Sequence, residues 1–109
     1  MSKVFFVGCG PGDPELITIK SKKLLQKADI VVYSGSLIPP KILNYCKKAK
    51  IHDAAKLVRE EIFKILLNGA KKNKSDVRLH DGDHAIYGAI GEQIDNLTTK
   101  GIESGVVPG

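Results

Sequence analysis

Apolar positions in this chain alternate between two periods. Short runs with apolar and β-branched residues predict five strands, at residues 4–7, 29–33, 50–52, 76–80 and 103–107, and the first of them is continuously apolar, as in a strand buried on both faces. Between the runs, apolar residues recur at helical spacing and predict four helices, at residues 16–28, 41–46, 55–67 and 86–97. Strands and helices therefore alternate throughout the chain.

Strands separated by helices of this length pair in parallel, because parallel neighbours need crossover connections. We therefore expect one α/β domain over residues 1–109, with three layers: a mainly parallel five-stranded sheet with helices on both faces. Pro39 and Pro40 are suited to start the second helix, and Asn68-Gly69 is predicted to cap the third.

The charge pattern favours a solvated surface. Seventeen Lys and Arg stand against twelve Asp and Glu, a net charge of +5. The lysines at 47–50 and 71–74 are interpreted as helix ends facing water, so no nucleic-acid partner is expected. A polycarboxylate small molecule would also be attracted to such a surface.

The location of the protein follows from what the sequence lacks. No apolar run approaches the roughly 20 residues of a membrane span, so no membrane partner is expected and the protein is predicted to be cytoplasmic. Cys9 and Cys46 form no C-x-x-C motif and are interpreted as buried or half-buried free thiols.

The first unusual loop follows the first predicted strand and reads G-C-G-P-G-D-P over residues 8–14. It is not a dinucleotide fingerprint, because Asp13 replaces the third glycine and the second strand ends in Tyr33-Ser34 rather than an acid; no P-loop lysine follows either. Alternate glycines allow a ligand to approach the backbone, and Pro11 and Pro14 stiffen the loop. A purely structural turn explains the composition equally well.

The second unusual loop, residues 80–88, holds two carboxylates and two imidazoles after the fourth strand. His80 and His84 have helical spacing, but Gly82 lies between them and only distant His52 offers a third strong ligand, so no metal is expected. Acid-base catalysis stays open, without an identified acceptor. Both loops follow strands, where parallel sheets bind ligands.

Both loops also resemble those of a known family, the tetrapyrrole methylases. The first resembles its V-G-x-G-P-G-D-P-x-L-[IL]-T opening at residues 7–18, and the second its R-L-H-T-G-D-P-x-[IM]-Y-G-A-I stretch at residues 78–90. Residues 28–33 resemble its A-D-V-V-x-Y strand, and residues 106–109 the V-P-G that joins its two halves. Within the family, the second loop and residues 33–37 are more similar to the precorrin-4 C11-methylating branch than to the uroporphyrinogen methylases.

The resemblance implies S-adenosylmethionine as methyl donor, a tetrapyrrole (precorrin) as substrate and no metal. It implies donor contacts, mostly through backbone groups, at these positions: Pro11, Asp81, Gly82, Asp83 and Ile86. Asp83 also fits a helix N-cap, and Tyr87 fits core packing, which are the structural alternatives for these two side chains. No catalytic side chain is implied, since methyl transfer from a sulfonium depends on alignment.

Three departures from the family pattern leave two hypotheses. First, the family continues into a second α/β half beyond Gly109. Second, Asp81 and His84 replace the Thr and Pro of the family pattern. Third, Ser104-Gly105 replaces bulkier residues of the last strand. The first hypothesis is the N-terminal half of a methylase, inactive alone but able to bind the donor. The second is a non-catalytic α/β domain that folds alone and associates as a homodimer.

Overall fold

The computed structural model describes residues 3–8, 17–34, 38, 40–80 and 87–107, with only the backbone of 87–89. The strands are β1 (Lys3–Gly8), β2 (Ile30–Tyr33), β3 (Lys50–Asp53), β4 (Asp76–His80) and β5 (Glu103–Val107). The helices are α1 (Ile19–Lys27), α2 (Pro40–Leu43), α3 (Arg59–Lys71) and α4 (Tyr87–Thr99), with a 3-10 turn, η2 (Ala54–Lys56), before α3. Among the described helices, none combines the length and apolar content needed to cross a membrane.

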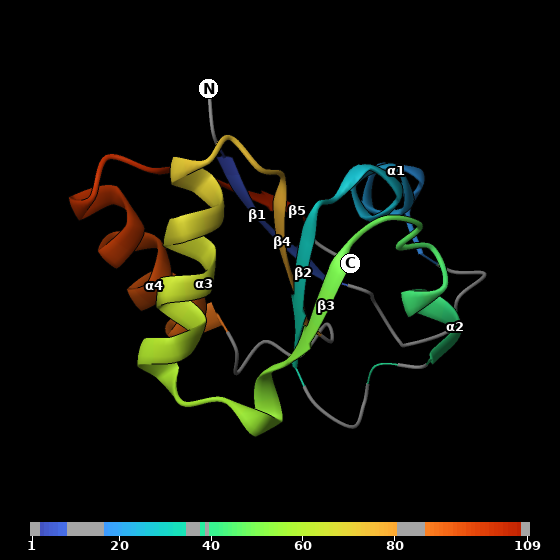
Figure 1. Cartoon of the computed structure of the whole chain (residues 1–109), viewed down its shortest axis with the longest axis horizontal. Coiled ribbons are helices and arrows are strands. Elements are labelled where there is room, and N and C mark those ends of the chain that lie inside the picture. The colour runs from blue at the N-terminus through green and yellow to red at the C-terminus, as the bar shows by residue number, and fades with distance from the viewer. Residues whose placement is uncertain (1–2, 9–16, 35–37, 39, 81–86, 108–109) are drawn as a thin grey trace.

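All five strands form one sheet in the order β3-β2-β4-β1-β5, as Figure 1 shows. Every pairing in it is parallel. The predicted five-stranded parallel sheet is therefore confirmed, and β4 and β5 have the predicted bounds.

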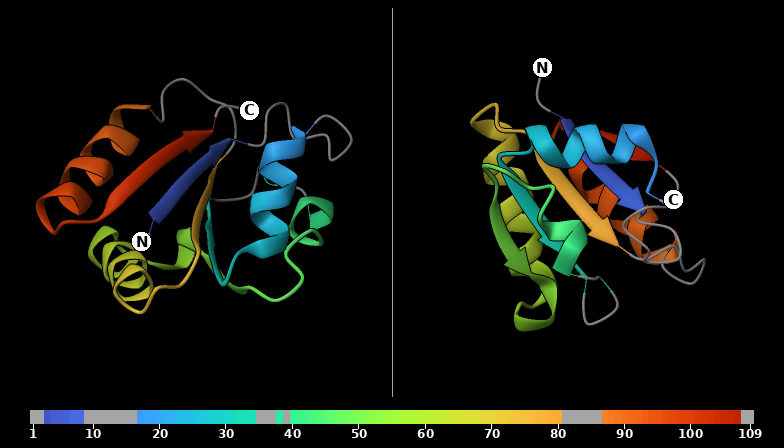
Figure 2. Two further views of the ribbon diagram at one scale, coloured as in Figure 1. Left: turned by 90° about the horizontal axis from the view of Figure 1, so that it is seen from above. Right: turned by 90° about the vertical axis from the view of Figure 1, so that its right-hand side faces the viewer.

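The helices cover the two faces of the sheet in pairs. Figure 2 shows α1 and α2 on one face and α3 and α4 on the other. Right-handed crossovers explain this division, because β1-α1-β2 and β2-α2-β3 move along the sheet in one direction while β3-α3-β4 and β4-α4-β5 move in the other.

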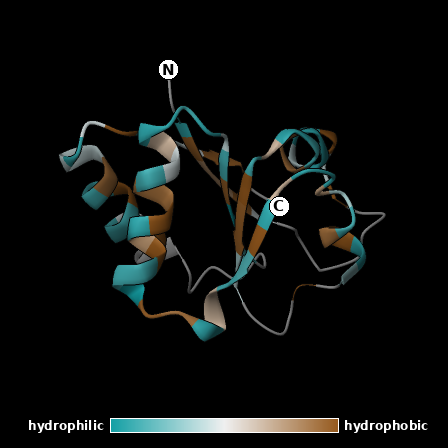
Figure 3. Cartoon of the chain, viewed as in Figure 1, coloured by the Kyte–Doolittle hydropathy of each residue, from teal (hydrophilic) through white to brown (hydrophobic). Residues whose placement is uncertain are grey.

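Two apolar clusters hold the layers together. Leu25, Ile42, Val31 and Leu79 belong to the cluster under α1 and α2, and Val4, Phe6, Leu66 and Leu97 to the cluster under α3 and α4. All eight side chains are at most 1% exposed. Residues of the central strands thus alternate between two covered faces, which explains why β1 reads as a continuous apolar run; Figure 3 shows the apolar strand residues in brown.

All four helices have bounds that differ from the prediction. The third begins at Arg59 instead of residue 55, because the 3-10 turn η2 precedes it. The first helix begins at Ile19 instead of residue 16, because Thr18 is its N-cap and accepts a 3.2 Å hydrogen bond from the Ser21 N–H. The second helix ends at Leu43, since the N–H groups of Tyr45 and Cys46 bond to carbonyls three residues back and close the chain in a turn.

The predicted cap at Asn68-Gly69 is wrong. The third helix continues to Lys71, and the left-handed residue that ends it is Asn73, with φ of 58°. The Lys74 N–H then returns to the Gly69 carbonyl at 2.9 Å. Gly69 instead lies inside the helix, packed against the Asp76 carboxyl.

Gly105 also has a packing role. A Cβ at this position would lie 2.9 Å from two ring carbons of Phe5, and the Lys3 ammonium stands 5.3 Å from the centre of that ring. The departure noted in the last strand therefore makes room for Phe5 on β1.

Candidate functional site

The ends of β1 and β4 lie directly side by side. Gly8, the last residue of β1, is in register with His80, the last residue of β4. The two unusual loops of the sequence therefore leave the sheet from neighbouring positions at its carboxyl edge. Their predicted donor contacts, Pro11, Asp81, Gly82, Asp83 and Ile86, lie outside the described residues, as does the side chain of Tyr87.

From these adjacent ends the chain departs toward opposite faces of the sheet. After β1 it continues to α1 on one face, and after β4 to α4 on the other. Such a divergence between neighbouring parallel strands is the topological switch point at which open α/β sheets bind ligands. The two loops that the sequence singled out therefore follow strand ends at this switch point.

Thr18 fixes the start of α1, the helix that follows the first loop. Besides accepting from the Ser21 N–H, its hydroxyl donates to the Ser21 Oγ at 2.8 Å. Ser21 is fully buried, so this pair anchors the start of α1 against the sheet. A buried strand end at Gly8 therefore precedes the first loop, and a helix start capped by Thr18 follows it.

A cation that sequence analysis did not single out is buried in β4. Arg78 is 8% exposed, and its Nη1 donates to the carbonyls of Val32 at 3.2 Å and Leu79 at 3.3 Å. Its Nε finds no acceptor among the described residues, and burial lowers its pKa to about 10. The only sequence signal was its place between two apolar residues, Val77 and Leu79, in a predicted strand.

Comparison with known proteins decides the family. A model of the Tetrapyrrole (Corrin/Porphyrin) Methylases matches residues 3–109. The chain belongs to the tetrapyrrole methylase family. Members of this family are methyltransferases that use S-adenosylmethionine.

Curated relatives of this methylase chain share up to half of its residues. The cobalt-precorrin-4 C(11)-methyltransferase of Methanocaldococcus jannaschii is 51% identical over 108 residues, 98% of this chain and 42% of that protein. The precorrin-4 C(11)-methyltransferase of Pseudomonas aeruginosa is 40% identical over 106 residues, 97% of this chain and 42% of that protein. The chain thus spans less than half the length of these relatives.

Solved structures agree with the assignment. The cobalt precorrin-4 methyltransferase CbiF superposes with a TM-score of 0.90 at 42% identity, covering 98% of this chain and 45% of that one. A uroporphyrin-III C-methyl transferase from Thermus thermophilus, complexed with S-adenosylhomocysteine, gives 0.80 at 36% identity, covering 98% and 44%. The methylase fold expected from the resemblance is confirmed.

The histidines weighed as metal ligands are separated in this methylase chain. His80 is 4% exposed at the end of β4, whereas His52 lies on β3, with β2 between them; His84 lies outside the described residues. Within the described part of the chain, no three His, Cys, Asp or Glu side chains group as metal ligands.

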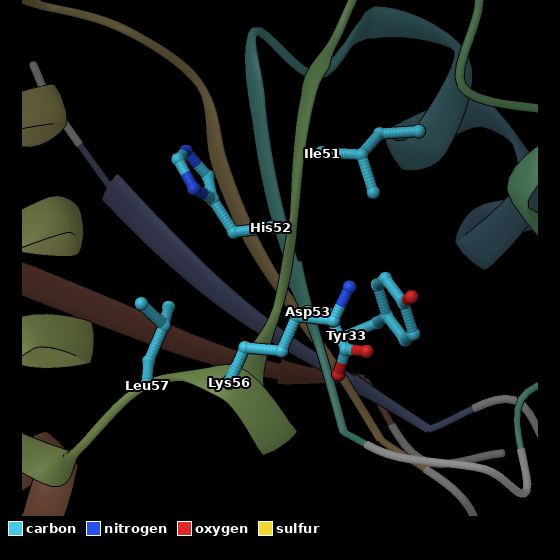
Figure 4. A pocket seen from close by; sticks show the side chains of 6 residues that line it. All are labelled: Tyr33, Ile51, His52, Asp53, Lys56 and Leu57. Carbon is cyan, nitrogen blue, oxygen red and sulfur yellow. The ribbon is translucent and has the colours of Figure 1, made fainter.

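A hollow opens at the carboxyl edge of the methylase sheet, where β2 and β3 end. It has a volume of about 390 Å³ and is lined by residues that include Tyr33, His52, Asp53 and Lys56, shown in Figure 4. Burial, and then the Asp53 carboxylate, raise the pKa of Tyr33, so its phenol stays protonated at neutral pH. Burial, followed by Lys50, lowers the pKa of His52 and favours the neutral imidazole. No sequence motif indicated this hollow, which depends on strand pairing.

Proposed function

We propose that this chain is the methyl-donor-binding part of an S-adenosylmethionine-dependent C-methyltransferase of corrin-ring biosynthesis, acting on precorrin-4 or cobalt-precorrin-4 at C11. Relatives that carry this activity in their names reach 51% identity. A uroporphyrinogen-III C-methyltransferase reaches 46% over 114 residues, so the general reaction is better supported than the exact ring.

The observation that carries the proposal is the register of Gly8 with His80 at a switch point of the sheet. In open α/β sheets, loops that leave adjacent strand ends for opposite faces form a ligand-binding crevice, so we expect one here, with the glycines of both loops leaving the backbone accessible to a ligand. We assign donor contacts to Pro11, Asp81, Gly82, Asp83 and Ile86 on this basis.

The chemistry asks for alignment from the protein. A bound sulfonium donor supplies an electrophilic methyl group, and holding it in line with a carbon nucleophile contributes up to about 7–11 kcal/mol. We propose that the chain contributes to that alignment by fixing both ends of the first loop, at the buried strand end Gly8 and at the helix start capped by Thr18. No side chain of the chain is proposed to exchange a proton with the substrate.

Turnover is proposed to need more than this chain. The relatives are more than twice as long, so the chain supplies under half of each. The isolated chain should therefore bind the donor product weakly and transfer no methyl group.

Calorimetric titration with S-adenosylhomocysteine tests the proposal. Binding in the micromolar to millimolar range is expected, weakened at least tenfold by Asp83→Ala. Asp95→Ala on α4 removes the same charge from an exposed position and is the matched control, expected to bind like the parent chain. Absence of binding at millimolar ligand, or equal losses in both variants, would contradict the assignment.

We also propose that the chain forms a homodimer through an open sheet edge. Ile51 on β3 is 40% exposed and Val106 on β5 is 46% exposed, so each edge strand presents an apolar side chain to solvent. Sedimentation velocity should give a dimer that Val106→Lys or Ile51→Lys dissociates. A monomer at all concentrations would refute this part.

A further inference from the structure

A pocket of about 470 Å³ lies at the amino edge of the sheet, between the end of α3 and the first residues of β2 and β3. Asp29 and Ile30 at the start of β2 and Lys50 at the start of β3 form one side, and Asn68 and Gly69 of α3 form the other. Gly8 and His80 lie at the opposite edge, so this pocket is separate from the proposed donor crevice.

Four lysines line the pocket: Lys48, Lys50, Lys72 and Lys74. In the sequence they belong to two separate groups, both interpreted as helix ends facing water. That interpretation is wrong for the first group, because α2 already ends at Leu43 and Lys50 begins β3. The fold brings these groups together, because β3 and the segment after α3 both flank β2 at the same edge. The result is a concave surface with four ammonium groups.

The carboxylate in the lining, Asp29, is already engaged. One of its oxygens lies 3.3 Å from the Lys48 ammonium and the other accepts from the Ser75 N–H at 2.9 Å. These contacts lower its pKa, the Ser75 hydrogen bond most, so it stays ionised and offsets one lysine. Lys50, Lys72 and Lys74 remain as excess positive charge.

The pocket also has an apolar floor and one further carboxyl behind it. Ile30 and Ile65 line the floor, and Gly69 separates it from Asp76, which is fully buried. Burial, with the nearby Asp29, raises the pKa of Asp76 to about 7. This carboxyl therefore opposes a bound anion only weakly in slightly acidic solution.

We propose that this lysine pocket binds a small anion carrying at least two carboxylate or phosphate groups. Its volume falls within the usual 300–1,000 Å³ of ligand pockets. Lysines near the end of α3 and lysines near β3 line the same hollow, and bringing like charges together costs free energy. Favourable interaction with the helix C-terminus accounts for the lysines after α3 but not for those near β3. Two or more anionic groups are required because the ammonium groups come from both sides of the pocket.

Amide NMR of the full chain titrated with citrate tests the proposal. Saturable shifts should concentrate at residues 29–30, 48–50 and 68–74, and acetate at equal ionic strength should not reproduce them. Lys72→Gln/Lys74→Gln should weaken citrate binding at least fivefold. Lys20→Gln/Lys23→Gln on α1, which removes the same charge from exposed positions elsewhere, should change it less than twofold.

Inorganic pyrophosphate serves as the second probe, and binding of either probe with the same pattern supports the site. Chemical shift changes spread over all lysines, or equal losses of citrate affinity in both double variants, would show nonspecific attraction to the positive charge of the chain. Either result would overturn the proposal. Titration of the Lys72→Gln/Lys74→Gln variant with S-adenosylhomocysteine separates the two sites, because that binding should be unchanged.

Discussion

Gly69 of α3 lies directly against the carboxyl group of Asp76 on β4. A Cβ at Gly69 would overlap the Asp76 Oδ1 and stand 2.7 Å from the Ile30 Cδ1. The absence of a side chain is therefore what lets the helix approach β2 and β4 so closely.

Gly69→Ala should destabilise the fold. Overpacking of this kind costs about 1–3 kcal/mol, against a gain of up to about 1 kcal/mol in helix propensity. Gly91→Ala on α4 is the matched control, because nothing lies within 4 Å of its added Cβ, and it should stabilise slightly. Urea midpoints measure both, and a stable Gly69→Ala variant would contradict the close contact.

Asp76 should make stability fall as the pH rises. Burial raises the pKa of Asp76 to about 7, and its two carboxyl oxygens lack a regular hydrogen bond. The backbone N–H of Ala70 lowers this pKa, but by less than burial raises it. Because the folded state holds this proton more tightly than the unfolded chain, stabilisation is complete below pH 4 and is lost progressively up to about pH 7.

Comparison with Asp76→Asn isolates the contribution of Asp76. The lowered pKa of His52 makes stability rise with pH, but it does so equally in the parent chain and in the variant, so it cancels in the difference. Between pH 5 and 8 the variant should gain on the order of 1–3 kcal/mol relative to the parent chain. Urea midpoints across this range provide the measurement, and parallel curves for the two proteins would show that Asp76 does not titrate there.

Replacing Arg78 by methionine should reduce the stability of the fold less than replacing it by lysine. Lysine keeps a buried charge but loses the planar fork that reaches the Val32 and Leu79 carbonyls, a cost of about 1–3 kcal/mol. Methionine fills similar space without a charge to desolvate, and such replacements are often neutral. Denaturation of the two variants tests the order, which would be wrong if Arg78→Lys matched the parent.

Cys46 should react slowly with thiol reagents. Burial raises its pKa from 9.0 to about 11, which lowers the thiolate fraction at pH 8 about a hundredfold. In a Cys9→Ser background, iodoacetamide should label the folded chain at least tenfold more slowly than the urea-unfolded chain. Equal rates would mean that the thiol is exposed.

The regular elements could be predicted because their patterns are local. Short runs with apolar and β-branched residues predicted all five strands, and helical spacing located all four helices. Gly69 was misread as a cap because its actual partner, Asp76, is a neighbour only in space. Arg78 was passed over for the same reason, since its burial depends on α3 and β2 together.

The site was predicted at the level of the sheet edge and no further. Strand ends and glycine-rich loops predict where a ligand would bind, and the Gly8–His80 register shows that the two strand ends are adjacent. The assignments of Pro11, Asp81, Gly82, Asp83 and Ile86 stay predictions. The lysine pocket could not be predicted, because its two halves are joined only by the order of the strands.

The strand order has a consequence for how the chain assembles. β1 pairs only with β4 and β5, so Val4 meets Asp76 and Ser104, partners that leave the ribosome long after it. During synthesis β1 therefore has no strand partner until β4, about 70 residues further along the chain, has emerged. Closing such distant pairs is slow, so early interruption of translation should yield an aggregation-prone product rather than a partly folded one.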